Sequence, residues 1–207
     1  MNNGQQKDLI FLVPDANMEH AIRGLMERKE ALTIRGEITF DIFKHPDRDP
    51  GVLRRSHEFL RNFRKDYCYS LVMFDREGCE QESKPAEELE ADVESRLRDE
   101  GWRNCCAAVV LDPELEIWVF ANSTHVVEVV AKGNRQLYHE MLERFDCLPN
   151  GKPRAPKQVM EELLRRNHIP RSSSLYLRLA QKVSLSGCQD RAFQRFREVL
   201  QRWFPRT

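Results

Sequence analysis

Residues 71–80 read LVMFDREGCE, and this stretch decides the fold. Together with the residues before it, it gives the near-continuous apolar run CYSLVMF over 68–74. Such runs are typical of parallel strands that are covered on both faces. The run ends in two carboxylates, Asp75 and Glu77, followed by a glycine. That ending is either an ordinary exit from a strand into a loop or one half of a metal site.

Three further segments have the pattern of strands. Two are apolar runs, and the third, residues 36–43, alternates Ile38, Phe40 and Ile42 with more polar positions, which suits an edge strand. Amphipathic helical patterns separate the strands at intervals of about 30 residues, the rhythm of βαβ units. The sequence therefore predicts an α/β fold with a mainly parallel four-stranded sheet flanked by helices, with strands at 8–13, 36–43, 68–74 and 106–111.

The strand rhythm stops after residue 112. Pro113 suits the first position of a helix, and apolar residues at helical spacing follow it within 113–130. Residues 147–157 contain three prolines and one glycine and are the best linker. We expect an α/β domain over residues 1–146 and a basic helical C-terminal region over 147–207. The helices predicted in that region cover about 156–167, 173–184 and 189–203, the last with a stripe of core aromatic residues.

Composition and sequence patterns argue against a membrane-spanning or a secreted protein. The chain has 207 residues, 41% of them hydrophobic and 32% charged, which indicates one folded domain with an extension or two small domains. No apolar run approaches the roughly 18 residues that span a bilayer, and the N-terminus does not resemble a secretory signal. The six cysteines lack a CxxC pair, which favours free thiols in a reducing cytoplasm. We therefore expect a cytoplasmic protein without a membrane partner.

The charge is unevenly distributed although the net charge is zero. Residues 151–207 contain 13 Lys and Arg against 4 Asp and Glu, and the rest of the chain has the opposite excess. The basic segment either faces a partner such as nucleic acid or neutralises the acidic part of the chain across an internal interface. The sequence leaves both interpretations open.

Acidic residues follow three of the four predicted strands, at the edge where open α/β sheets bind ligands. Mg²⁺ prefers carboxylate oxygens, and gathered carboxylates repel one another unless a cation lies between them. The alternative is structural: Asp15 or Asn17 caps a helix, and the acids after the fourth strand favour a helix N-terminus. The acids are Asp15 and Glu19 after the first strand, Asp75 and Glu77 after the third, and Asp112, Glu114 and Glu116 after the fourth.

One other motif lies near this edge. Residues 43–51, FKHPDRDPG, place His45 just past the second strand, with two prolines. This loop either reaches the acidic edge or forms a surface turn shaped by the prolines. The sequence contains no phosphate-binding GxxxxGK[ST] or GxGxxG loop and no G-x-S-x-G motif.

These residues give the chain a resemblance to Toprim-like proteins of prokaryotic defence and mobile-element neighbourhoods, relatives of the overcoming-lysogenization-defect nucleases and the RloB-like families. In the resemblance, which covers about residues 8–121, Asp75 and Glu77 match the D-x-D motif after the third strand. Asp15, or less directly Glu19, matches the glutamate after the first strand. The run PELEIW at 113–118 is similar to one branch of the group, and most like the small component of a methylation-associated anti-phage defence system. Asp15-Ala16 replaces the usual Glu-Gly, and Glu77 replaces the second aspartate.

The resemblance implies a Mg²⁺- or Mn²⁺-dependent nuclease that acts in antiviral defence beside other defence proteins. Asp75 and Glu77 would be the main metal ligands, and Glu116 an additional one. Asp15 or Glu19 would complete the site or act as the base, so that the catalytic set is Asp15, Glu19, Asp75 and Glu77. The alternatives are a non-catalytic Toprim-like adaptor or nucleic-acid-binding subunit of a defence complex, and a regulatory binder of a nucleotide or a modified nucleic acid at the same edge.

Overall fold

The computed structural model describes residues 6–120 and 123–206. Four parallel strands form one sheet in the order β2-β1-β3-β4, which confirms the predicted α/β fold and the edge position of the second strand. The strands are β1 (Lys7–Val13), β2 (Phe40–Lys44), β3 (Tyr67–Asp75) and β4 (Cys106–Leu111).

Helices connect the strands and continue the chain after β4. Within the α/β part they are α1 (Ala16–Met26), α2 (Lys29–Leu32), α3 (Arg48–Leu60), η1 (Arg61–Phe63), α4 (Ala86–Leu97) and η2 (Arg98–Trp102). Beyond β4 they are η3 (Leu115–Trp118), α5 (Thr124–Ala131), α6 (Arg135–Arg144), α7 (Pro156–Arg166), α8 (Ser173–Lys182) and α9 (Arg191–Trp203).

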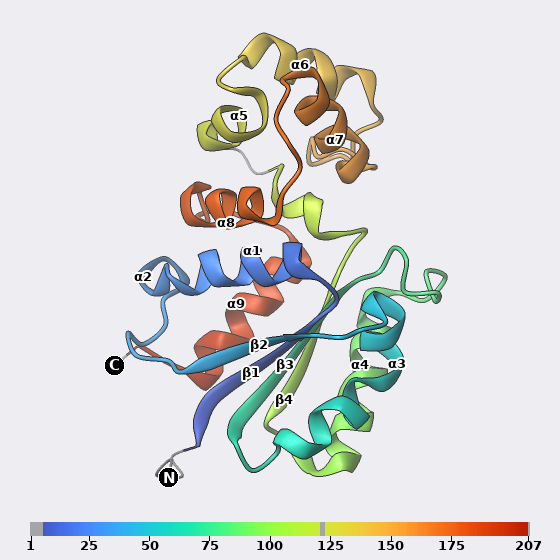
Figure 1. Cartoon of the computed structure of the whole chain (residues 1–207), viewed down its shortest axis with the longest axis vertical. Coiled ribbons are helices and arrows are strands. Elements are labelled where there is room, and N and C mark those ends of the chain that lie inside the picture. The colour runs from blue at the N-terminus through green and yellow to red at the C-terminus, as the bar shows by residue number, and fades with distance from the viewer. Residues whose placement is uncertain (1–5, 121–122, 207) are drawn as a thin grey trace.

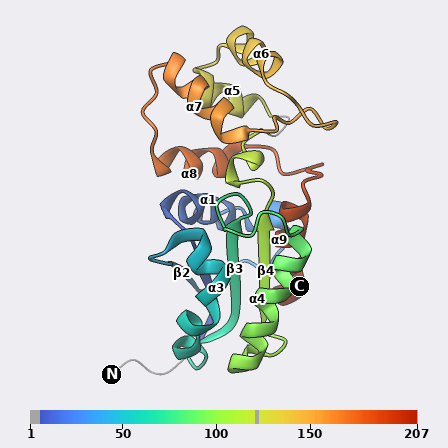
Figure 2. The ribbon, with the colours of Figure 1, turned by 90° about the vertical axis from the view of Figure 1, so that its right-hand side faces the viewer.

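The sheet has a separate hydrophobic core on each face because successive side chains of a strand point to opposite sides. In β1, Leu9 and Phe11 join the core beneath α1, α8 and α9, whereas Ile10 and Leu12 join the core beneath α3 and α4. All four side chains are fully buried. This arrangement, with helices on both faces, is visible in Figure 1 and, from the side, in Figure 2.

Two predicted elements differ from the structure. The second strand begins at Phe40 rather than at residue 36, because the Asp8 carboxylate binds the backbone N–H and the hydroxyl of Thr39 just before it. The prediction of a helix that begins at Pro113 is also wrong. Glu114 has an extended backbone, and two separate elements, the short η3 and then α5, follow it. Residues 121–122 of that stretch lie outside the described residues.

Helices α5, α6 and α7 pack on one another and form what we call the helical cap, at the end of the molecule reached by the carboxyl ends of the strands (Figures 1 and 2). The chain then returns, since α8 lies against α1 and α9 packs on β4. Phe193 and Phe196 of α9 are buried, as its apolar stripe predicts. The C-terminal region thus completes one face of the α/β unit.

The free edge of β4 is covered by charged side chains from two helices. Glu90 Oε1 accepts a hydrogen bond from the Val110 N–H (2.9 Å), and Arg191 donates to the Val110 carbonyl (3.1 Å). Two positions earlier on the strand, Glu94 and Arg195 bind the N–H and the carbonyl of Ala108 in the same way. We call Glu90, Glu94, Arg191 and Arg195 the edge clamp. It occupies the backbone groups that a fifth strand would use.

The edge clamp also pairs basic residues of the C-terminal segment with acidic residues of the first half of the chain. Arg191 lies 2.9 Å from Glu90, which is 2% exposed, and Arg195 lies 2.6 Å from Glu94. These arginines of the basic C-terminal segment therefore neutralise acids of the first half, as the internal-interface interpretation requires.

Helices α1 and α8 approach closely at Gly24. A Cβ atom at this position would lie 2.8 Å from both the Ala180 Cβ and the Leu177 carbonyl oxygen. We expect Gly24→Ala to lower the free energy of unfolding by about 1–3 kcal/mol, because overpacking outweighs the gain in helix propensity. Chemical denaturation measures the change, and Gly36→Ala, with open space around its new methyl group, is the control. Equal stability of Gly24→Ala and the wild type would contradict this packing.

All six cysteines are free thiols. Among the described residues, none of the helices combines the length and apolar character needed to cross a membrane.

Candidate functional site

Carboxylates gather where the four strands end, facing the helical cap. Asp15 follows β1, Asp49 lies in the first turn of α3 after β2, and Asp75 is the last residue of β3. Glu114 and Glu116 follow β4. We call these five residues the acidic edge. All four strands therefore lead into an acid, one more than the sequence predicts.

Asp75 is the centre of the acidic edge. Burial raises the pKa of its carboxyl well above the ordinary value, and the nearby charges of Asp49, Glu116, Glu114 and Asp15 raise it further. Its Oδ1 is buried and has no hydrogen-bond partner within the described part of the chain. A buried carboxylate oxygen without a donor is unfavourable, and it is the strongest indication of a ligand at this edge.

Asp49 belongs to the 43–51 loop and is the member of the acidic edge that was not among the predicted site residues. Its Oδ1 accepts a hydrogen bond from the Asp75 N–H at 2.9 Å. Burial raises the pKa of Asp49 to about 6, and the negative charge of Asp15 contributes to the rise. The hydrogen bond from the Asp75 N–H lowers this pKa but does not cancel the effect of burial. Both interpretations of residues 43–51 are therefore partly correct: the loop turns tightly, with the Asp47 N–H donating to His45 Nδ1, and it also reaches the acidic edge.

Glu114 and Glu116 are buried beneath the helical cap and α8, with 5% and 4% exposure. The backbone N–H of Lys157, at the start of α7, donates to Glu114 Oε1 (3.0 Å), and the ammonium group of Lys157 lies 3.8 Å from Glu114 Oε2. Burial, followed by the charge of Glu116, raises the pKa of Glu114 to about 7.

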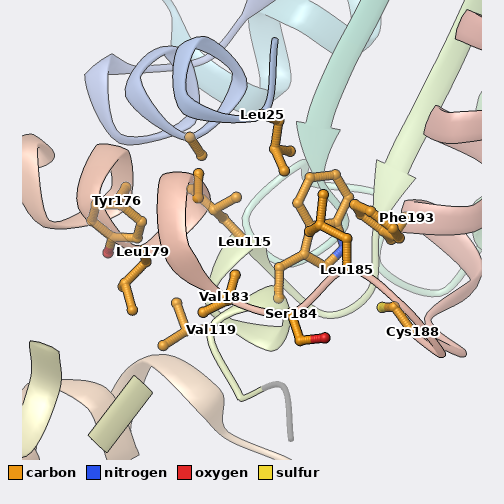
Figure 3. Close-up of a pocket in the computed structure, with 13 residues that line it drawn as sticks. Leu25, Leu115, Val119, Tyr176, Leu179, Val183, Ser184, Leu185, Cys188 and Phe193 are labelled. Atoms are coloured by element: carbon orange, nitrogen blue, oxygen red, sulfur yellow. The ribbon is translucent and has the colours of Figure 1, made fainter. Parts of the chain in front are cut away.

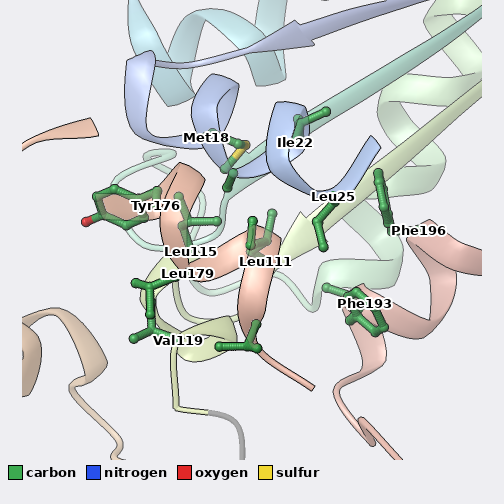
Figure 4. Close-up of a cluster of buried hydrophobic side chains, with 14 of the residues drawn as sticks. Met18, Ile22, Leu25, Leu111, Leu115, Val119, Tyr176, Leu179, Phe193 and Phe196 are labelled. Atoms are coloured by element: carbon green, nitrogen blue, oxygen red, sulfur yellow. The ribbon is translucent and has the colours of Figure 1, made fainter. Parts of the chain in front are cut away.

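Glu116 has a separate pair of partners. The Tyr176 hydroxyl donates to Glu116 Oε1, and the Arg171 guanidinium lies 3.8 Å from the same oxygen. The ring of Tyr176 packs on the buried cluster around Leu115 and its hydroxyl points out of that cluster (Figure 4). Burial raises the pKa of the Tyr176 phenol, which therefore stays a neutral donor to Glu116.

Asp15 and Glu19, two further predicted site residues, are each bound by groups of the protein. Asp15 accepts hydrogen bonds from the N–H groups of Asn17 (2.9 Å) and Met18 (3.0 Å), so it caps α1 as the structural alternative predicts. The carboxylate of Glu19 is bound by Arg23 (2.9 Å) and Lys44 (2.7 Å). Burial raises its pKa, but the hydrogen bonds from Lys44 and Arg23 outweigh burial and hold it below the ordinary value.

Two acids lie at the rim of the site. Glu77 is exposed in the loop after β3, and its N–H donates to the Pro113 carbonyl (2.9 Å), which ties that loop to the one after β4. Asp112 forms an ion pair with Arg76 at 2.9 Å. The predicted residues therefore divide: Asp15, Asp75 and Glu116 belong to the acidic edge, Glu77 is exposed at its rim, and Glu19 is held by two cations.

The donor chemistry of the acidic edge suits a hard divalent cation, because every member offers carboxylate oxygens. In residues 6–120 and 123–206, however, no three acids, histidines or cysteines converge on a metal position. Glu114 and Glu116 are held by Lys157, Arg171 and Tyr176 instead. The helical cap and α8 therefore cover Glu114 and Glu116, whereas Asp15, Asp49 and Asp75 are half-buried. Within the described part of the chain, the Asp75 Oδ1 is the buried oxygen of the acidic edge that has no hydrogen-bond partner.

A cavity beside α8 is apolar, unlike the acidic edge. It has a volume of about 50 Å³ and is lined almost entirely by apolar side chains of α1, η3, α8 and the segment after α8, among them Leu25 and Leu179 (Figure 3). The liquid volume of a water molecule is about 30 Å³, so the cavity holds no more than a small apolar group. It does not compete with the acidic edge as a site for a charged ligand.

Comparisons with protein-family models, with curated proteins and with solved structures give no match to this chain.

Proposed function

We propose that the chain is a divalent-cation-dependent phosphodiesterase that cleaves nucleic acid, and that it acts within a prokaryotic anti-phage defence system. The observation that carries the proposal is the buried Oδ1 of Asp75, which lies near four other acids and has no hydrogen-bond partner among the residues that the structure describes. The resemblance of the sequence to Toprim-like defence proteins supports the nucleic-acid substrate and the defence role.

Asp75 would hold the cation together with Asp49, which is already linked to it through the backbone. Glu77 at the rim and Glu116 beneath the cap would complete the ligands, and Asp15 would add negative charge. Glu19 would contribute only after release from Arg23 and Lys44. Bound Mg²⁺ or Mn²⁺ offsets the mutual repulsion of the acids, polarises a phosphodiester and lowers the pKa of a water molecule.

The residues of the chain have further roles in this proposal. Glu114, with a pKa of about 7, lies in the range where a carboxyl group both takes up and releases a proton near neutral pH. Lys157 and Arg171 present positive charges to the acidic edge, and a substrate phosphate is a natural partner for them. They now lie beside Glu114 and Glu116, so substrate binding would exchange these contacts.

A cleavage assay tests the proposal. The purified chain is incubated with single-stranded and duplex DNA and RNA, with Mg²⁺, with Mn²⁺ and with a chelator. We expect metal-dependent cleavage that Asp75→Asn lowers by a factor of about 10² or more. Asp112→Asn, which removes an exposed acid of the same sheet edge, is the matched control and should retain activity. Cleavage that persists in Asp75→Asn or in the chelator would refute the assigned site.

A specific observation also favours a second candidate, the non-catalytic adaptor. Lys157, Arg171 and Tyr176 satisfy two of the five acids, as expected if those acids only attach the helical cap and α8 to the sheet. An adaptor would show no rise in melting temperature with Mg²⁺ or Mn²⁺. A phosphodiesterase would show a rise that Asp75→Asn abolishes, because a ligand that binds only the folded state stabilises it.

A further inference from the structure

A second concave site lies within the helical cap, apart from the acidic edge. This cap groove has a volume of about 350 Å³, within the range of pockets that hold small organic ligands. It is bounded by the beginning of α5, by one face of α6 and by the turn before α7. Its lining residues are Phe120, Ser123, Thr124, Val127, Arg135, Tyr138, His139, Leu142, Asn150, Gly151 and Lys152.

The cap groove has an apolar floor. The rings of Phe120 and Tyr138 lie nearly parallel, with centroids 6.4 Å apart and an angle of 23° between the planes. The two residues are 6% and 8% exposed, so only a small part of each ring reaches the groove, and the half-buried Val127 and Leu142 supply further apolar surface. An aromatic and aliphatic floor of this kind suits a flat, weakly polar group such as a nucleobase.

The rim of the cap groove is polar and basic. Arg135 and His139 are exposed and lie one turn apart on α6, and Ser123 and Thr124 contribute hydroxyl groups at the beginning of α5. Among the described lining residues there is no carboxylate. In a chain with equal numbers of acids and bases, a groove without an acid has a preference for anions.

Arg135 carries most of this preference. The Asn134 side chain caps α6 through the Leu137 N–H (3.0 Å) and so fixes the turn that presents Arg135. Lys152 contributes less, because its ammonium group donates to the Ile117 carbonyl (2.9 Å) and lies 3.9 Å from Asp190.

We propose that the cap groove binds a nucleoside monophosphate, with the base on the floor formed by Phe120 and Tyr138 and the phosphate at the rim beside Arg135 and His139. The phosphomonoester belongs either to a free mononucleotide or to the 5′ end of a nucleic acid. The inference is independent of the proposed phosphodiesterase, because the groove and the acidic edge share no residue.

Isothermal titration with AMP tests the proposal. We expect AMP to bind the wild-type chain, and Arg135→Gln to weaken binding about tenfold or more. Arg144→Gln, at the other end of α6 and outside the groove, removes the same charge and should bind AMP like the wild type. Adenosine should bind much more weakly than AMP. Absence of AMP binding, equal weakening by both arginine variants, or equal binding of adenosine would each overturn the proposal.

Two further arms separate the sources of the phosphate and the two sites. Competition by a 5′-phosphorylated oligonucleotide, but not by its 5′-hydroxyl form, assigns the groove to nucleic-acid ends, whereas competition by neither assigns it to free nucleotides. Equal competition by both forms would overturn recognition of the phosphomonoester. Asp75→Asn should leave AMP binding unchanged, and loss of binding in this variant would contradict the independence of the groove.

Discussion

Glu90→Ala is expected to destabilise the fold by about 2–3 kcal/mol, one of the largest losses of stability that we anticipate from a single substitution in this chain. Glu90 is 2% exposed and accepts hydrogen bonds from Arg191 and from the Val110 N–H. Its removal leaves the buried Val110 N–H without this acceptor and takes one carboxylate partner from the half-exposed guanidinium of Arg191, which keeps Glu87 at 3.2 Å. The desolvation cost of the unpaired Val110 N–H then adds to the loss of the charge-assisted hydrogen bonds.

Urea denaturation of Glu90→Ala and of the control Glu88→Ala measures the effect. Glu88 lies on the same helix, but its ion pair with Lys84 is solvent-exposed, so its loss should change stability by no more than about 0.5–1 kcal/mol. In a double-mutant cycle with Arg191→Ala, the combined loss should be smaller than the sum of the two single losses. Additive losses, or a Glu90→Ala variant as stable as Glu88→Ala, would show that the edge clamp does not act as a unit.

The edge clamp also shows why the sequence left the charge asymmetry open. Glu90 and Glu94, like Arg191 and Arg195, are spaced four apart, which places each pair on one helix face. That spacing is also typical of an exposed helix, and only the return of α9 to β4 makes it a buried contact. Contacts between residues about 100 positions apart depend on the tertiary path of the chain, which local patterns do not contain.

The fold itself was predictable for a physical reason. Strands β1, β3 and β4 are buried on both faces, so their sequences are uninterrupted apolar runs with a clear signal. The segment after β4 was not predictable in the same way. Pro113 and the apolar spacing that follows are compatible with a helix, but Glu114 adopts an extended backbone and turns its side chain to the Lys157 N–H.

The candidate site was predictable in part. Parallel topology places the strand ends together, which is enough to associate Asp15 and Asp75 with the acids after β4. Asp49 was not among the predicted site residues because its role depends on α3 beginning at Arg48, within the predicted 43–51 loop. The partners of Glu114 and Glu116 come from α7, α8 and the connection between them, more than 40 residues away, and no sequence pattern relates these positions.

The second large effect that we expect is a fall in the stability of the metal-free chain as the pH rises. The pKa of Asp49 is raised from 3.8 to about 6 and that of Glu114 from 4.5 to about 7, and the pKa of Asp75 is raised as well. Between the ordinary and the raised values, the folded state binds more protons than the unfolded state. The free energy of unfolding therefore falls with rising pH across this window.

The expected size of this fall is a few kcal/mol, since each unit of pKa difference corresponds to about 1.4 kcal/mol. Acids whose pKa values are lowered, such as Glu19 and Glu162, act in the opposite direction, but at more acidic pH. Burial lowers the pKa of His45 below 6.5, so this residue opposes the fall just below pH 6.5 and reduces its size. Urea denaturation between about pH 5 and pH 8, in the presence of a chelator, measures the slope. Asp75→Asn should flatten it, because the variant removes the central charge of the acidic edge, whereas Asp112→Asn should leave it unchanged.

A divalent cation should reverse the slope. If the acidic edge holds Mg²⁺ or Mn²⁺ as proposed, the cation binds the ionised carboxylates, so the stability gained from the metal grows as the pH rises. The wild-type chain should then be more stable at pH 8 than at pH 5 in saturating Mn²⁺ and less stable in the chelator. If the slope is the same with and without metal, the acidic edge does not bind the cation, and the proposed phosphodiesterase is refuted. The raised pKa values of the acids would not be contradicted by that result.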